Sequence, residues 1–116
     1  MIFMDKIQKI KGFSDVFSPR SDSYNLLEAR ARNIFSRYGF DELRLPLVEK
    51  TELFARSIGS ETDIVQKEMY TFPDRKGRSL SLRPEATAGV ARAYIEQKVY
   101  ASQEISKLFT LSPMFP

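Results

Sequence analysis

Residues 69–87 read MYTFPDRKGRSLSLRPEAT, and this stretch decides the class of fold. Residues 69–72 and 79–83 are short strand candidates, and the connection between them contains Pro73 and Gly77. Such a connection is typical of a β-hairpin, whose strands run antiparallel. Pro84 ends the second strand because it has no N–H for a strand ladder, and a helix is predicted over residues 87–98. The pattern indicates an α+β fold with an antiparallel sheet and flanking helices.

A long amphipathic helix is predicted upstream, over residues 21–38. Ser18 and Pro19 suit its start, and Gly39 suits its end. Its apolar side chains recur three or four positions apart, at Tyr24, Leu27, Ala31, Ile34, Phe35 and Tyr38. We expect this face to be buried, and we interpret most of the nine Phe and five Tyr residues as core.

Three further elements complete the predicted fold. Residues 40–48 alternate apolar and polar side chains as a strand does, but Pro46 would confine that strand to an edge, a bulge or a subunit contact. Thr51 suits the start of a short helix over residues 51–58. A last strand is predicted over residues 107–115, and we expect the sheet to continue beyond residue 116.

The composition excludes several kinds of site. Because the chain has no cysteine and no histidine, it can form neither a disulfide nor a Cys/His zinc site, and we expect no metal ligands in it. It contains no GxxxxGK[ST] or GxGxxG motif, so nothing supports a P-loop or a dinucleotide fold. The net charge of +3 fits a nucleotide or nucleic-acid partner, but the charges are interspersed, which favours an ordinary soluble domain. No apolar run could span a membrane or serve as a secretory signal, so the cytoplasm is the expected compartment.

Glu85 and Thr87 stand where chemistry could occur, at the mouth of the helix predicted over residues 87–98. A carboxylate there suits a substrate ammonium group, and a threonine hydroxyl could add a hydrogen bond. The pattern alone favours a simpler role, in which Thr87 caps the helix and Glu85 complements its positive end. Two other polar stretches could meet a substrate or phosphates, or could simply be solvated: residues 56–63 and 74–78.

Residues 54–72 and 80–87 strongly resemble histidyl-tRNA synthetases, and residues 11–15 look like that family's opening segment. The resemblance implies part of a class II aminoacyl-tRNA synthetase core. Residues 21–38 and the strand through Pro46 then look like motif 1, which implies a homodimer interface. Glu85, Ala86 and Thr87 match the positions that bind histidine, with Glu85 at the α-amino group. No catalytic residue is assigned, and residues 56–63 match a segment near the active site without a defined role.

The chain departs from the family pattern at two positions. Ala86 stands where the family usually has glycine, which matters if the backbone needs a positive φ. Pro116 stands where the motif 2 arginine, which contacts the ATP α-phosphate, is expected. We therefore expect residues 1–116 to be the N-terminal part of a catalytic domain, from motif 1 to the start of motif 2, without the anticodon-binding domain.

The activity implied for the parent enzyme is ligation of histidine to tRNA(His), with ATP and Mg²⁺ as cofactors. We expect the 116 residues alone to be inactive and to bind no cofactor. One alternative is the regulatory subunit of ATP phosphoribosyltransferase, which resembles this fold without ligase chemistry. Another is a structural or interaction module that self-associates through apolar surface.

Overall fold

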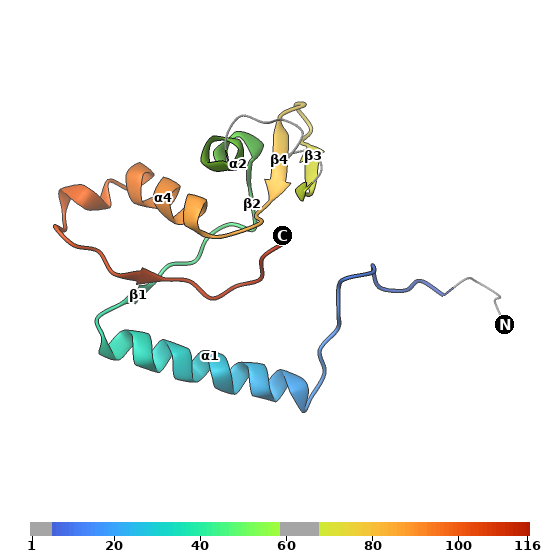
Figure 1. The fold of residues 1–116 in the computed structure, drawn as a ribbon, viewed down its shortest axis with the longest axis horizontal. Coiled ribbons are helices and arrows are strands. Elements are labelled where there is room, and N and C mark those ends of the chain that lie inside the picture. The colour runs from blue at the N-terminus through green and yellow to red at the C-terminus, as the bar shows by residue number, and fades with distance from the viewer. Residues whose placement is uncertain (1–5, 59–67) are drawn as a thin grey trace.

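The structure is a computed structural model, and it describes residues 6–58 and 68–116. Helices and strands are interspersed along the chain, as the sequence predicts. In order they are α1 (Arg20–Arg37), β1 (Asp41–Glu42), β2 (Val48–Lys50), α2 (Thr51–Ile58), β3 (Thr71–Pro73), β4 (Ser79–Leu82), α4 (Thr87–Glu96), the 3-10 helix η1 (Val99–Ala101) and β5 (Leu108–Phe109), shown in Figure 1. Within the described residues, no helix is both long and apolar enough to cross a bilayer.

The predicted hairpin is confirmed, and it forms two strands of a three-stranded antiparallel sheet in the order β2-β4-β3. Its turn is built by Asp74, whose Oδ1 accepts the backbone N–H groups of Lys76 and Arg78, both at 2.8 Å. Gly77 completes the turn at a φ of 81°, which glycine adopts without strain. The hydroxyl of Thr51 lies 2.8 Å from that of Ser81, which ties α2 to β4.

The end of α1 follows the predicted glycine stop. Gly39 has a φ of 80°, and its N–H donates to the carbonyl of Ser36 at 3.1 Å. The N–H of Phe40 reaches back to the carbonyl of Phe35 at 2.9 Å, which completes a Schellman motif. The ring of Phe35 stacks on Phe109 with centroids 4.6 Å apart, so this helix end is fastened to β5.

Two of the strand predictions are wrong in extent. The strand over residues 40–48 is split into β1 and β2, and Pro46 lies in the gap between them. β1 pairs in parallel with β5, which makes a second, two-stranded sheet that the sequence did not indicate. The strand predicted over residues 107–115 is reduced to Leu108–Phe109, because β1 offers only two residues for pairing.

The hydrophobic core is small and lies between α2, β4 and α4. Its buried apolar members are Phe54, Met69 and Ala88. The prediction that the apolar face of α1 is buried is wrong: Leu27 is 66% exposed and Ile34 is 54% exposed. Most of the described aromatic residues interpreted as core are not buried either, and four of them are at least half-exposed: Phe17, Tyr38, Tyr70 and Tyr100. The Cα radius of gyration is 18.2 Å, against roughly 13 Å for a compact domain of this length.

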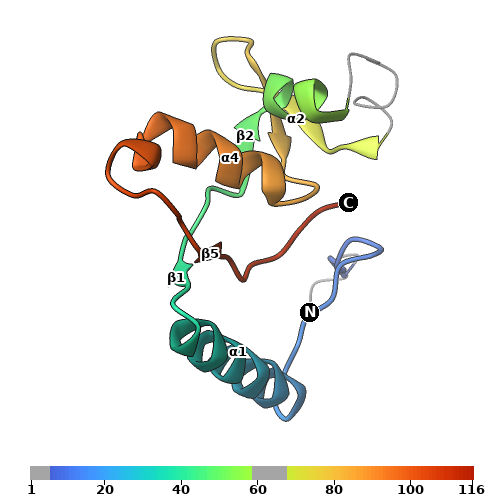
Figure 2. The ribbon, with the colours of Figure 1, turned by 60° about the vertical axis from the view of Figure 1, so that its left-hand side comes forward.

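The exposure of α1 follows from its place in the fold. Figures 1 and 2 show α1 on the far side of the β1–β5 pair from α2, β4 and α4. An apolar face is stabilised only by another apolar surface, and α1 meets little of one among the described residues. The apolar face of α1 is therefore exposed to solvent.

Candidate amino-acid-binding site

Glu85 begins the candidate site, immediately before α4. Its carboxylate accepts the backbone N–H of Thr87 and, at 3.1 Å, that of Ala88. These are the first N–H groups of α4, which have no partner inside the helix. A carboxylate there also complements the positive end of the helix. The prediction that Thr87 caps the helix is wrong in its residue, because Thr87 is already helical and Glu85 supplies the acceptor.

The arrangement leaves Glu85 able to accept a ligand. Each of its two carboxylate oxygens receives one backbone N–H, while an ionised carboxylate offers about four acceptor positions. Glu85 is half-buried and the side chain of Thr87 is exposed, so both can meet a molecule that arrives from outside. The carboxylate is thus held in place without being saturated.

Ala86 fits its position between these two residues. Its φ is −101° and its ψ is −21°, so the backbone is in the ordinary right-handed region. The substitution of glycine by alanine is strained only where φ is positive. The structure therefore removes the concern that the sequence raised about Ala86.

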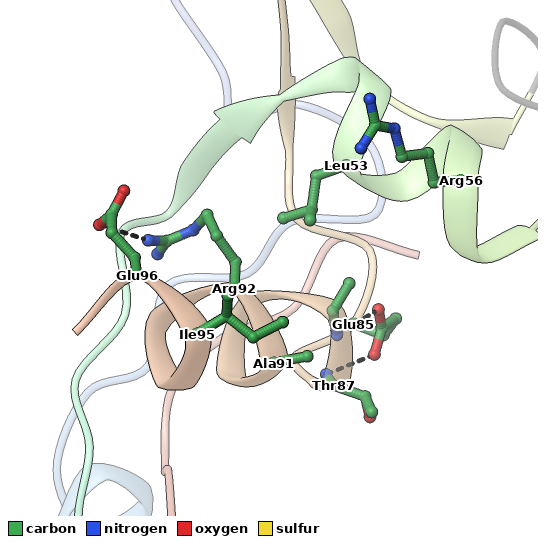
Figure 3. Close-up of a pocket in the computed structure, with 9 residues that line it drawn as sticks. Leu53, Arg56, Glu85, Thr87, Ala91, Arg92, Ile95 and Glu96 are labelled. Atoms are coloured by element: carbon green, nitrogen blue, oxygen red, sulfur yellow. Dashed lines mark hydrogen bonds and ion pairs between the residues drawn. The ribbon is translucent and has the colours of Figure 1, made fainter. Parts of the chain in front are cut away.

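A pocket of about 780 Å³ lies between α2 and α4, with Glu85 at one end. Figure 3 shows Leu53 and Arg56 on α2, on the other side of this space from α4, with Glu96 at the opposite end from Glu85. The lining residues are apolar in the middle and charged at the ends: Leu53, Arg56, Glu85, Thr87, Ala88, Ala91, Arg92, Ile95 and Glu96. A mostly apolar pocket with a few convergent polar groups is the usual form of a small-molecule site.

The polar stretch at residues 56–63 is only partly described. Arg56 lines the pocket, as Figure 3 shows. Residues 59–63, and the side chains of residues 57 and 58, lie outside the described part of the chain. In the other charged stretch, residues 74–78, Arg78 Nε donates to Asp74 Oδ2 at 2.6 Å. These two charged side chains therefore stabilise the β3–β4 turn.

Arg83 lies next to the site, and no role for it is predicted from the sequence. It is 2% exposed, and its guanidinium donates to three main-chain carbonyls. These belong to Pro113, Leu45 and Pro46, at 3.1, 3.2 and 3.3 Å respectively. The sequence signal that could have predicted this role is an arginine at the end of an apolar strand, directly before a proline. A charge that is buried at such a position needs several hydrogen-bond partners.

A family model described as histidyl-tRNA synthetase matches residues 12–114 of the chain. The chain belongs to the histidyl-tRNA synthetase family. The histidine–tRNA ligase of Oleidesulfovibrio alaskensis is 63% identical over 112 residues, which are 97% of this chain and 27% of that relative. The corresponding ligase of Solidesulfovibrio magneticus is 65% identical over 97% of this chain and 26% of its own length. The chain thus spans about a quarter of the length of the curated relatives it matches.

Solved structures agree with this membership of the histidyl-tRNA synthetase family. The apo histidyl-tRNA synthetase of S. aureus superposes with a TM-score of 0.83 at 35% identity, covering 96% of this chain and 30% of that one. A Bacillus halodurans structure, titled as an ATP phosphoribosyltransferase regulatory subunit/histidyl-tRNA synthetase, gives a TM-score of 0.74 at 20% identity, covering 94% of this chain and 28% of that one. The second likeness shows a shared fold alone. The predicted class II synthetase fold, with an antiparallel sheet, is confirmed.

Proposed function

We propose that this chain is the N-terminal part of the catalytic domain of a histidine–tRNA ligase and that it supplies one wall of the histidine site. The complete enzyme would activate histidine with ATP and transfer it to tRNA(His). The observation that carries the proposal is the carboxylate of Glu85, fixed by two N–H groups of α4 at the end of the pocket. Identities of 63% and 65% to histidine–tRNA ligases support the same assignment.

Within that site, Glu85 would bind the α-amino group of histidine. An ammonium group offers three donors and a positive charge, so it suits an ionised carboxylate with free acceptor positions. The hydroxyl of Thr87 would add a hydrogen bond from the same side, with Ala86 as the short link between them. This is a binding role, and no residue of the described chain is assigned to proton transfer or nucleophilic attack.

ATP and Mg²⁺ belong to the complete enzyme in this proposal. Stabilising charge on the α-phosphate requires fixed cations, and the position where the family's motif 2 arginine is expected carries Pro116. Among the described residues, no three His, Cys, Asp or Glu side chains are grouped as metal ligands, and we assign no magnesium ligand to them. We expect the 116 residues by themselves to show no histidine-dependent ATP–pyrophosphate exchange.

The proposal extends to assembly and location. The exposed apolar face of α1, in the region that resembles motif 1, supports a homodimer formed through this helix. The cytoplasm is the compartment in which a ligase for tRNA would act. The tRNA would be a partner of the complete enzyme.

The test is made in the complete ligase that carries this segment. Glu85→Gln removes the charge but keeps the size, so we expect the KM for histidine in ATP–pyrophosphate exchange to rise about 10- to 100-fold, as loss of a charge-assisted hydrogen bond predicts. The deamino analogue imidazolepropionate has no ammonium group, so its inhibition constant should be the same in both proteins. Glu104→Gln is the matched control, because Glu104 is exposed and has no place in the site. An unchanged KM for histidine in Glu85→Gln would contradict the proposed role.

A regulatory subunit of ATP phosphoribosyltransferase is the second candidate. It is favoured only by the shared fold of the Bacillus halodurans structure, at 20% identity. The reading frame beyond residue 116 discriminates between the two. An arginine in the motif 2 region of that frame supports the ligase, and its loss supports the regulator.

A further inference from the structure

We propose that Arg83 is a positioning residue, which sets the distance between the histidine-binding carboxylate of Glu85 and the segment at residues 113–115. The inference rests on the proposed function, in which residues 113–115 lead toward the ATP-binding motif. Arg83 does not touch the substrate in this proposal. It acts by fixing the main chain on both sides of the site.

The side chain of Arg83 connects two segments that have no strand ladder of their own. Residues 43–47 lie between β1 and β2, and residues 110–116 follow β5. Main-chain carbonyls outside regular structure need partners when they are removed from water. Arg83 supplies one donor, Nε, to Pro113 and another, Nη1, to Leu45 and Pro46.

The main chain of Arg83 holds the same two segments. Its N–H donates to the carbonyl of Leu47 at 2.9 Å, and its carbonyl accepts the N–H of Phe115, also at 2.9 Å. Phe115 is also held from the other side by Phe13, with ring centroids 6.2 Å apart. Residues 45–47 and 113–115 therefore share one anchor, and that anchor is Arg83.

The position of Glu85 is tied to the same anchor. Pro84 is the single residue between them, and its ring fixes φ near −65°. On its other side Glu85 is bound to the N–H groups of Thr87 and Ala88. The carboxylate and residues 113–115 can therefore move apart only if the contacts of Arg83 break.

The chemistry of the guanidinium group indicates that Arg83 does more than stabilise the fold. A buried cation costs several kcal/mol in desolvation, and the hydrogen bonds that it donates to carbonyls largely offset that cost. Among the described residues, Arg83 forms no ion pair with a carboxylate, so its charge is balanced by carbonyl dipoles only. What a planar guanidinium adds is a rigid fork of donors with fixed directions, which neither lysine nor methionine can reproduce.

The absence of cysteine from the chain allows a direct distance measurement. Spin labels on Gln97→Cys and Ser112→Cys, both exposed positions, report the separation of α4 from the residue before Pro113. Labels on Lys50→Cys and Lys76→Cys, also exposed, report the three-stranded sheet as a control. Pulsed electron paramagnetic resonance of the 116-residue chain, mixed with an excess of unlabelled chain so that only label pairs within one molecule are measured, should give one narrow distance for each pair.

Arg83→Lys and Arg83→Met should each lose the single narrow distance between positions 97 and 112 and keep the control distance. Unchanged distances in both variants would overturn the proposal. Equal broadening of the control pair would overturn it too, because Arg83 would then hold the whole fold and not this segment. Glu85→Gln should leave both distances unchanged, so failure of the histidine-binding role and failure of the Arg83 role are distinguishable.

A kinetic measurement in the complete ligase separates positioning from binding. A displacement of about 1 Å between reacting groups can cost about 100-fold in rate. Arg83→Lys should therefore lower kcat for ATP–pyrophosphate exchange by about that factor, with little change in the KM for histidine. A raised KM for histidine with kcat intact would assign Arg83 to the binding of histidine and overturn the positioning role.

Discussion

The guanidinium of Arg92 on α4 lies 3.0 Å from the carboxylate of Glu49 on β2. The side chain of Glu49 is 9% exposed, whereas that of Arg92 is 28% exposed and also reaches Glu96 at 3.2 Å. A nearly buried carboxylate requires a partner, and Arg92 is the one it has among the described ion pairs. This pair fixes α4 against the edge strand of the three-stranded sheet.

Arg92→Met should therefore destabilise the chain by leaving Glu49 without its cation. We expect the free energy of unfolding to fall by about 1–3 kcal/mol, the usual cost of an unsatisfied buried acceptor. Urea unfolding measures it as a lower midpoint at constant slope. Glu96→Gln is the matched control, because it removes only the exposed partner of Arg92 and should cost less than about 0.5 kcal/mol. Equal losses of stability in the two variants would show that the Arg92–Glu49 pair contributes no more than the exposed Arg92–Glu96 pair.

Gly89 lies close to Glu49. Replacing this helical glycine by alanine should therefore lower the stability of the fold, where such a replacement usually raises it. A Cβ at residue 89 would stand 3.2 Å from Glu49 Oε2 and 3.3 Å from Leu45 Cδ1. Alanine normally stabilises a helix by about 1 kcal/mol relative to glycine. Because Arg92 holds Glu49 in place, we expect the cost of crowding to exceed that gain, so that Gly89→Ala is less stable than the parent by about 1 kcal/mol. Thermal unfolding followed by circular dichroism tests this, and a variant more stable than the parent would show that Glu49 and Leu45 give way.

The β3–β4 turn should carry a pH dependence that originates at Asp74. The backbone N–H of Arg78 is the largest cause that holds the pKa of Asp74 below its usual 3.8. The side chain of Arg78 and the backbone N–H of Lys76 act in the same direction, against desolvation. A carboxyl whose pKa is lowered by folding stabilises the fold above its unfolded pKa, and this contribution is lost as pH falls through the folded pKa.

Asp74→Asn should accordingly melt at a lower temperature than the parent near neutral pH. The difference should shrink below about pH 4 and vanish below the folded pKa of Asp74, because the parent carboxyl is then uncharged as well. Thermal unfolding across this pH range gives the comparison, and nuclear magnetic resonance shifts of the Lys76 and Arg78 amides report the titration itself. A melting difference that stays constant with pH would contradict the assignment.

The open apolar face of α1 should make the chain self-associate. Leu27 and Ile34 lie two helical turns apart on one face and are 66% and 54% exposed. Burial of such side chains is worth about 1.5–3 kcal/mol each, which favours association with a second copy. Light scattering should show a mass that rises with concentration, and Leu27→Glu or Ile34→Glu should reduce it toward the monomer. Asn33→Glu adds the same charge elsewhere on α1 and should not, whereas a monomeric parent at all concentrations would contradict the expectation.

Local signals in the sequence were sufficient for most of the elements. The hairpin over residues 69–83, the helix stop at Gly39 and the helices over residues 51–58 and 87–96 each depend on side chains close in the chain. The extent of the long strands was not predictable in this way. A strand is as long as the partner that it pairs with, and the pairing of β1 with β5 joins residues far apart in the chain.

The stretch at residues 69–87 by itself determined the antiparallel hairpin, the break at Pro84 and the carboxylate at the start of α4, because turns and helix starts depend on neighbouring residues. The resemblance to histidyl-tRNA synthetases implies histidine as the ligand of that carboxylate. The tertiary structure alone decided the role of Arg83, the negative φ of Ala86 and the exposure of α1. The hydrogen-bond partners of a buried charge and the surface that packs on an apolar face both come from residues far away in the chain. Neither can therefore be predicted from the local sequence pattern.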